Sequence, residues 1–170
     1  MDECDVVEIA VPRVAAELKL FDRVDYEDAF RTQTWTPRTS EQLMRDVFEE
    51  APDWFLHAWS TVLGKGIFGR GLDLEQRPDR VVGWKVVADT GEVFATGVDL
   101  PRGLHARLFA IASPSEEIVG TQIRLNSAYA RAWWPAVRAG HRYFLPYLFR
   151  RSAERARRRH SLAHPQGLAP

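Results

Sequence analysis

Polar and apolar residues alternate along residues 24–34, and this pattern predicts a β-strand. One face of the strand would carry Tyr26, Asp28, Phe30 and Thr32. Because successive side chains of a strand point to opposite faces, Glu27 and Asp28 should lie on different sides of the sheet. The sequence therefore places one acidic side chain beside two aromatic ones on a single face.

Helical spacing of apolar residues predicts three short helices in the first part of the chain. They cover Val14–Leu20, the stretch from Thr39 or Ser40 to Pro52, and Trp54–Leu63. Pro12 suits the first turn of the first helix, and Thr39 or Ser40 is typical of an N-cap for the second. An alternating stretch before them, Val6–Val11, predicts a short strand.

Residues 80–126 have a different sequence pattern, in which strand-like segments are separated by short turns. The four expected strands are Val81–Ala88, Glu92–Leu100, Leu104–Ala112 and Glu117–Asn126. Consecutive hairpins of this kind form an antiparallel meander. In the third strand the alternation does not decide whether Leu104 and Ala106 or Arg107 and Phe109 face the core.

A long helix is predicted from Asn126 or Ser127 to about Arg159, because apolar residues recur along one face of it. The expected core-facing stripe is Tyr129, Trp133, Val137, Phe144 and Leu148. Pro135, Pro146 and Gly140 predict that this helix is bent or split. Residues 160–170 have the composition of a disordered tail.

The chain of 170 residues is the length of one domain, expected over residues 1–159. A strand, short helices, a meander and a long aromatic helix predict an α+β domain with the long helix buried against one sheet face. A curved sheet that grips one helix leaves a cavity between them.

The formal net charge is zero, which argues against a uniformly basic nucleic-acid binder, and we expect no DNA or RNA partner. The charges are nevertheless polarised, from an acidic first third to an arginine-rich end between Arg150 and Arg159. No run approaches the roughly 20 apolar residues of a membrane span and no leader is recognisable, so a soluble, cytoplasmic protein is expected. Cys4 is the only cysteine, which excludes an internal disulfide.

Residues 64–71 formally contain G-x-G-x-x-G, the glycine pattern of dinucleotide-binding loops. That pattern should follow a strand and open a helix, whereas here the glycines follow a predicted helix. We interpret them as a helix stop and turn, and we expect no cofactor. His160 and His164 are spaced four residues apart, but no third ligand is near, so no metal site is expected either.

Three segments resemble the helix-grip superfamily of START-like, pollen-allergen-like and polyketide cyclase proteins, and more specifically an uncharacterised bacterial branch of it. The segments are Val24-Asp25-Tyr26-Glu27-Asp28-Ala29-Phe30, Glu50-Ala51-Pro52-Asp53-Trp54, and Tyr129-Ala130-Arg131-Ala132-Trp133-Trp134 leading to His141-Arg142. The resemblance covers most of residues 20–152, although Ala139-Gly140 stand where relatives often carry a proline. It implies a helix-grip fold with an apolar pocket, and it implies no particular reaction.

Side chains that could transfer protons near neutral pH are His57, His105, His141, Asp28, Tyr26 and Tyr143. We assign Asp28, His141 and Tyr26 as catalytic candidates, because the early strand and the last helix of a helix-grip domain border one cavity. The residues expected to bind substrate are Trp84, Arg107, Phe109, Tyr129 and Trp133. Asp28 and His141 should lie close together, with Tyr26 and Arg107 nearby.

The leading hypothesis is a pocket protein that works without a cofactor, binds an apolar polyketide-like or polycyclic molecule and catalyses its cyclisation or rearrangement. Two other readings stay open: a carrier or sensor without catalysis, and an interaction module that uses the arginine-rich end. A cavity with converging polar groups favours the enzyme, and a wholly apolar cavity favours the carrier. A homodimer is also left open.

Overall fold

The computed structural model describes residues 5–71 and 73–163, in which seven antiparallel strands form one open, curved sheet in the order β1-β2-β7-β6-β5-β4-β3. The strands are β1 (Val7–Ile9), β2 (Tyr26–Gln33), β3 (Arg80–Val81), β4 (Trp84–Asp89), β5 (Val93–Asp99), β6 (Leu104–Ala112) and β7 (Glu116–Leu125). The helices are α1 (Arg13–Glu17), α2 (Ser40–Phe48), α3 (Asp53–Ala58), the π-helix η1 (Trp59–Phe68) and α4 (Ala128–Ala163). The expected α+β class and the antiparallel meander are confirmed.

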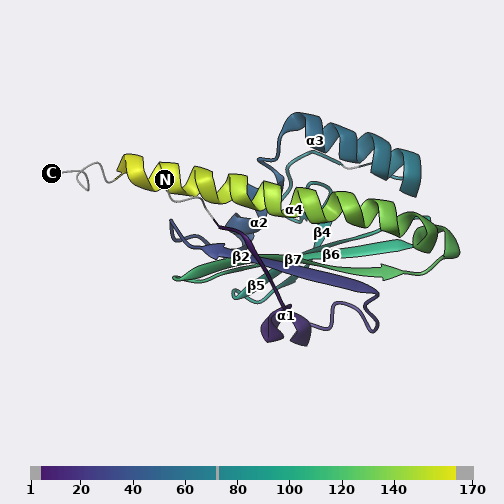
Figure 1. The fold of residues 1–170 in the computed structure, drawn as a ribbon, viewed down its shortest axis with the longest axis horizontal. Helices are drawn as coiled ribbons and strands as arrows, with labels where there is room; N and C mark the ends of the chain where they lie inside the picture. Colours follow the sequence, from purple (N-terminus) through teal and green to yellow (C-terminus); the bar gives the residue numbers. More distant parts are fainter. Residues whose placement is uncertain (1–4, 72, 164–170) are drawn as a thin grey trace.

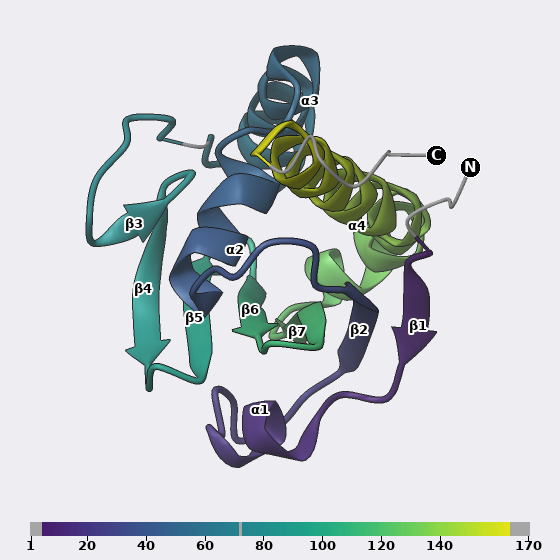
Figure 2. The same cartoon turned by 90° about the vertical axis from the view of Figure 1, so that its left-hand side faces the viewer.

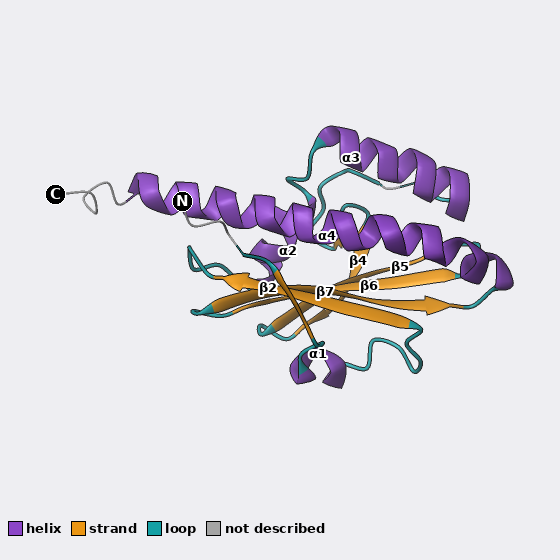
Figure 3. Cartoon of the chain, in the orientation of Figure 1, coloured by secondary structure: helices purple, strands orange, loops and turns teal. Residues whose placement is uncertain are grey.

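Helices cover both faces of the sheet (Figures 1 and 3). The long helix α4 crosses one face, which we call the inner face, with α2 beside it. Helix α3 lies next to α4 and farther from the sheet (Figure 1). The short helix α1 lies against the opposite, outer face, as the end-on view makes clear (Figure 2). Each face therefore has its own apolar core.

Local sequence signals explain where α2 begins and how β2 is oriented. The hydroxyl of Thr39 accepts a hydrogen bond from the backbone N–H of Gln42, and the side-chain oxygen of Gln42 accepts one from the backbone N–H of Thr39. This capping box satisfies two N–H groups that the first helical turn would leave free. In β2, Glu27 is exposed and Asp28 is buried, so the two acids face opposite sides as predicted.

The helix α4 is one uninterrupted α-helix, so of the two predicted alternatives, a bent or a split helix, the split is wrong. Pro135 and Pro146 each remove a backbone hydrogen bond, but Pro135 is exposed, so water can reach the carbonyl that it leaves free. Packing of α4 against the sheet, α2 and η1 outweighs the loss at two positions. The helix also continues to Ala163, past the expected end at Arg159, and residues 164–170 lie outside the described part of the chain.

The face of β6 that the sequence left undecided is settled by the neighbouring glycines. Leu104, Ala106 and Leu108 point to the inner face, and Phe109 belongs to the outer core. A Cβ atom at Gly120 would lie 2.2 Å from the Phe109 ring, and one at Gly97 would lie 2.5 Å from the Arg107 side chain. Both large side chains thus occupy space that the two glycines leave on the outer face.

The buried stripe of α4 is shifted from the expected one. Trp134 is 9% exposed and Ala130 is fully buried, whereas Tyr129 and Trp133 are 38% and 42% exposed. The prediction that Tyr129 and Trp133 are largely buried is therefore wrong. Adjacent residues of a helix differ by about 100° in direction, so a change of one position moves a side chain from the core to the rim.

An ion pair between Arg38 and Glu117 ties three elements together on the inner face. The guanidinium donates to both carboxylate oxygens of Glu117, at 2.7 and 2.6 Å, and the side chains are 7% and 1% exposed. Its remaining donor reaches Asp46 of α2 at 2.7 Å and Ser152 of α4 at 3.1 Å. Burial alone would lower the pKa of Arg38, but the two carboxylates outweigh it and hold that pKa above its usual range.

We expect Arg38→Met to lower the free energy of unfolding by about 3–5 kcal/mol, because Glu117 would be left buried without a partner. The control is Arg13→Met, which breaks an exposed pair with Glu17 and should cost less than about 1 kcal/mol. Urea unfolding monitored by circular dichroism measures both. Equal losses in the two variants would contradict the role assigned to Arg38.

Candidate functional site

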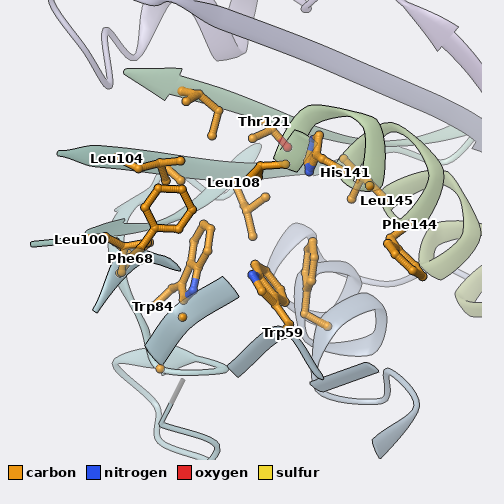
Figure 4. Close-up of a pocket in the computed structure, with 18 of the residues that line it drawn as sticks. Trp59, Phe68, Trp84, Leu100, Leu104, Leu108, Thr121, His141, Phe144 and Leu145 are labelled. Carbon is orange, nitrogen blue, oxygen red and sulfur yellow. The ribbon is translucent and has the colours of Figure 1, made fainter. Parts of the chain in front are cut away.

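A cavity of about 320 Å³ lies between the inner sheet face, the first half of α4 and the π-helix η1 (Figure 4). Its walls are mainly aromatic and aliphatic, and the labelled residues are Trp59, Phe68, Trp84, Leu100, Leu104, Leu108, Thr121, His141, Phe144 and Leu145. Exposed Arg70 and Asp73 also border it, which places charge at its rim. The cavity thus has an apolar interior with Thr121 and His141 as polar groups on its wall.

Glycines bring the wall segment after η1 close to its neighbours. A Cβ atom at Gly64 would lie 2.5 Å from the carbonyl oxygen of Arg70, and one at Gly83 would lie 2.7 Å from the backbone of Asp73. Gly69 ends η1 in the left-handed conformation, with a φ of 79°. The helix therefore stops within the glycine-rich segment as predicted, but it runs to Phe68 and not to the expected end at Leu63. The glycine-rich segment therefore shapes the cavity wall.

His141 of α4 and Asp28 of β2 form a hydrogen-bonded pair at this wall, so their predicted proximity is confirmed. Nε2 of His141 lies 3.1 Å from one carboxylate oxygen of Asp28 and 3.4 Å from the other. The Asp28 side chain is fully buried, and His141 is 20% exposed and lines the cavity. Because a carboxylate only accepts hydrogen bonds, Nε2 of His141 carries a proton in this pair. When the ring is neutral, Nδ1 is its basic atom.

Tyr26 of β2 is the third member of this hydrogen-bonded group and contacts Asp28. Its hydroxyl donates to Asp28 at 2.7 Å, and its ring contacts Trp134 and His141 edge-on. Burial first, and then the hydrogen bond to Asp28 and its charge, raise the pKa of Tyr26 to about 12. Tyr26 therefore remains a hydrogen-bond donor at neutral pH and orients the carboxylate that orients His141.

The strand register extends this polar site across the inner face. Thr96 pairs with Leu108, Leu108 with Thr121, and Thr121 with Asp28, which places these residues in one row over β5, β6, β7 and β2. The hydroxyl oxygens of Thr96 and Thr121 are both buried and have no hydrogen-bond partner among residues 5–71 and 73–163. Thr121 borders the cavity, and its hydroxyl points toward the His141 ring (Figure 4).

Other residues predicted for the site lie in different places. Trp84 lines the cavity, but Arg107 lies on the outer face, where it pairs with Asp99 at 2.9 Å and covers the ring of Phe21. The prediction that Arg107 lies near Asp28 is therefore wrong, and Phe109 is enclosed in the outer core.

Tyr129 and Trp133 are placed on the exposed side of α4 and do not border the cavity. The Tyr129 hydroxyl instead donates to the carbonyl of Ile67 at 2.9 Å. Two further candidates for proton transfer, His57 and Tyr143, are exposed, and His105 is bonded to Asp99 at 2.8 Å. None of these three borders the cavity.

Thr121 and Trp59 were missed as site residues from the sequence. Trp59 lies in the predicted helix Trp54–Leu63 and Thr121 in the predicted strand Glu117–Asn126, and membership of these elements does not mark a site residue. A threonine among Val119 and Ile123 on one face of this strand was the available signal, since a hydroxyl is costly to bury there.

The arginine-rich end of α4 is partly neutralised by the acidic first third of the chain. Arg155 and Arg159 both pair with Glu50, at 2.9 and 3.3 Å. Within residues 5–71 and 73–163, no three His, Cys, Asp or Glu side chains cluster as a metal site, and His164 lies outside those residues. No helix in the same part of the chain is both long and apolar enough to cross a bilayer.

No protein-family model matches the chain, and neither does any curated protein or solved structure. The assignment of function therefore depends on the site itself.

We expect Tyr26→Phe to reduce the pH dependence of the free energy of unfolding at alkaline pH. The pKa of Tyr26 is about 12 in the folded protein, against 10 for an ordinary tyrosine, so the folded state holds its proton longer. Stability linked to this group is complete below pH 10 and is lost as the pH rises toward 12. The free energy of unfolding, measured across this pH range, should fall less steeply in the variant than in the parent protein. The increase in tyrosinate absorbance near pH 12 should also disappear. Persistence of that increase would assign it to another tyrosine.

Proposed function

We propose that this protein binds a small, largely apolar, ring-containing molecule in the inner-face cavity and that His141, oriented by Asp28, acts on it as a general base. We also propose that the sheet and α4 form a helix-grip domain. The curved antiparallel sheet and the long C-terminal helix on its inner face support this assignment.

The observation that carries the proposal is the contact between His141 and the fully buried Asp28, at 3.1 Å, on the wall of an apolar cavity. A histidine held by a carboxylate has a fixed tautomer and ring orientation, as a general base requires. The carboxylate also stabilises the imidazolium that forms when His141 takes a proton. An apolar wall excludes water, which strengthens both interactions.

The cavity volume and walls support a compact ligand. About 320 Å³ lies at the lower end of the 300–1,000 Å³ typical of small-molecule sites, which suits a ligand of one or two fused rings. The walls would hold it in one orientation while His141 removes a proton, and proton removal by a positioned base is a step of cyclisations and related rearrangements. The polar pair on the cavity wall favours an enzyme over a carrier with the same cavity.

Ala106→Leu should lower the affinity for the neutral dye N-phenyl-1-naphthylamine at least tenfold, because the added carbons would occupy the cavity. Ala106 is buried on its sheet wall. The matched control is Ala139→Leu, at an exposed position of α4, which should bind the dye like the parent protein. Dye fluorescence on titration measures both. Unchanged binding in a folded Ala106→Leu variant would place the dye elsewhere and count against the cavity.

Native mass spectrometry of the purified protein should reveal a retained ring compound, and that compound is the substrate for the catalytic test. Asp28→Asn and His141→Ala should each lower turnover by roughly 10²–10⁴, the usual contribution of a positioned general base, with affinity changed about tenfold or less. The split between turnover and affinity separates catalysis from a structural defect. Tight binding with no turnover in the parent protein would identify a carrier instead.

A further inference from the structure

The hydroxyl of Thr121 is the unexplained polar group of the cavity. The residue is 1% exposed, its oxygen has no hydrogen-bond partner among the described residues, and it borders the cavity next to His141. An unpaired buried hydroxyl costs stability, and valine would fill the same space without that cost. A ligand atom that accepts or donates a hydrogen bond would remove the penalty.

His141 offers the complementary group. Its Nε2–H is used by Asp28, and its Nδ1 atom makes no hydrogen bond within residues 5–71 and 73–163. The wall therefore presents a hydroxyl donor and a nitrogen lone pair side by side, with the Thr121 oxygen pointing toward the ring (Figure 4). One chemical group that satisfies both is a hydroxyl, which can donate one hydrogen bond and accept another.

We propose that Thr121 and His141 together bind a ring hydroxyl, so that the ligand of the cavity is a phenol-type compound of one or two rings. This inference rests on the proposed function and adds the chemical class of the ligand. The ligand O–H donates to Nδ1 of His141, and its oxygen accepts from the Thr121 hydroxyl. The aromatic walls, including Trp59 and Trp84, contact the ring.

Other oxygen functions fit less well. A carbonyl would pair with Thr121 but would leave the Nδ1 lone pair of His141 facing an acceptor. A carboxylate would meet that same lone pair and the nearby charge of Asp28. Among the described residues that border the cavity, Arg70 is the permanently charged cation, and it lies at the exposed rim.

The same geometry supplies a balanced proton transfer. The proton of the bound hydroxyl moves to Nδ1 of His141, and the electron pair of the broken O–H bond remains on the ligand oxygen. The products are a phenolate that accepts from Thr121 and an imidazolium that donates to Asp28. A phenolate ring is a stronger carbon nucleophile than the neutral phenol, which connects ligand class and cyclisation.

Competition for bound N-phenyl-1-naphthylamine by naphthalene, 2-naphthol and 2-methoxynaphthalene tests the inference at neutral pH. We expect 2-naphthol to bind about tenfold more tightly than naphthalene, as one or two net hydrogen bonds allow. The methyl ether should show no such preference, because it has no proton for His141. Thr121→Val should lower the preference for 2-naphthol several-fold and affect naphthalene little.

Thr96→Val is the matched control, because Thr96 is equally buried and unpaired in the same row but does not border the cavity. Both valine variants should be at least as stable as the parent, and only Thr121→Val should change the preference. Equal binding of 2-naphthol and naphthalene would overturn the phenol inference alone. A methyl ether as tight as 2-naphthol would also overturn it, and binding of neither dye nor naphthalene would overturn the proposed function.

Discussion

A carboxylate cannot stay charged and unpaired inside a protein, and this constraint fixes how α4 lies on the sheet. In the described part of the chain, two carboxylates are buried on the inner face. Glu117 pairs with Arg38, which also reaches Ser152 of α4, and Asp28 pairs with His141 of α4. The two contact points on α4 are 11 residues apart in the sequence, or roughly 16 Å along a helix. The corresponding points on the sheet lie on neighbouring strands, since Glu117 pairs with Thr32, four positions along β2 from Asp28. Both the rotation and the position of the helix are therefore set by polar contacts as well as by apolar burial.

The contacts at His141 and Ser152 hold α4 on the sheet, and the first half of the helix spans the cavity. Apolar side chains such as Trp134 hold this half against the sheet, and η1 closes the remaining side. A π-helix has a wider backbone repeat than an α-helix and is frequent at functional sites. Here it carries Trp59 and Phe68 onto the cavity wall, while Gly64 lets the following segment approach closely. The cavity therefore results from the positions of the two ion pairs that hold α4 and from the space that η1 leaves open between α4 and the sheet.

The order and type of the elements could be predicted because alternation and helical spacing are local properties of the sequence. The aromatic neighbours of Asp28 indicated a buried face for its side chain, and the helix-grip arrangement that the resemblance implied placed His141 at the same cavity. Which side chains of β6 face inward could not be predicted, because Leu108 and Phe109 are both apolar and both faces of the sheet are covered. Gly97 and Gly120, on the flanking strands, make room for Arg107 and Phe109 on the outer face. The choice of Trp134 over Trp133 also depends on tertiary anchors, since either tryptophan continues an apolar stripe.

The two unpaired threonines show why burial energetics alone does not explain the inner face. Thr96 and Thr121 are equally buried and occupy one row of the sheet, so both carry the cost of an unsatisfied hydroxyl. Only Thr121 stands beside the cavity and the imidazole of His141. Fold stability would favour an apolar side chain at that position, next to Val119 and Ile123. A polar group that the fold itself does not satisfy, placed against an oriented base, is consistent with a requirement imposed by the ligand. On this argument the free energy that Thr121 costs the unliganded protein is recovered when the cavity is occupied.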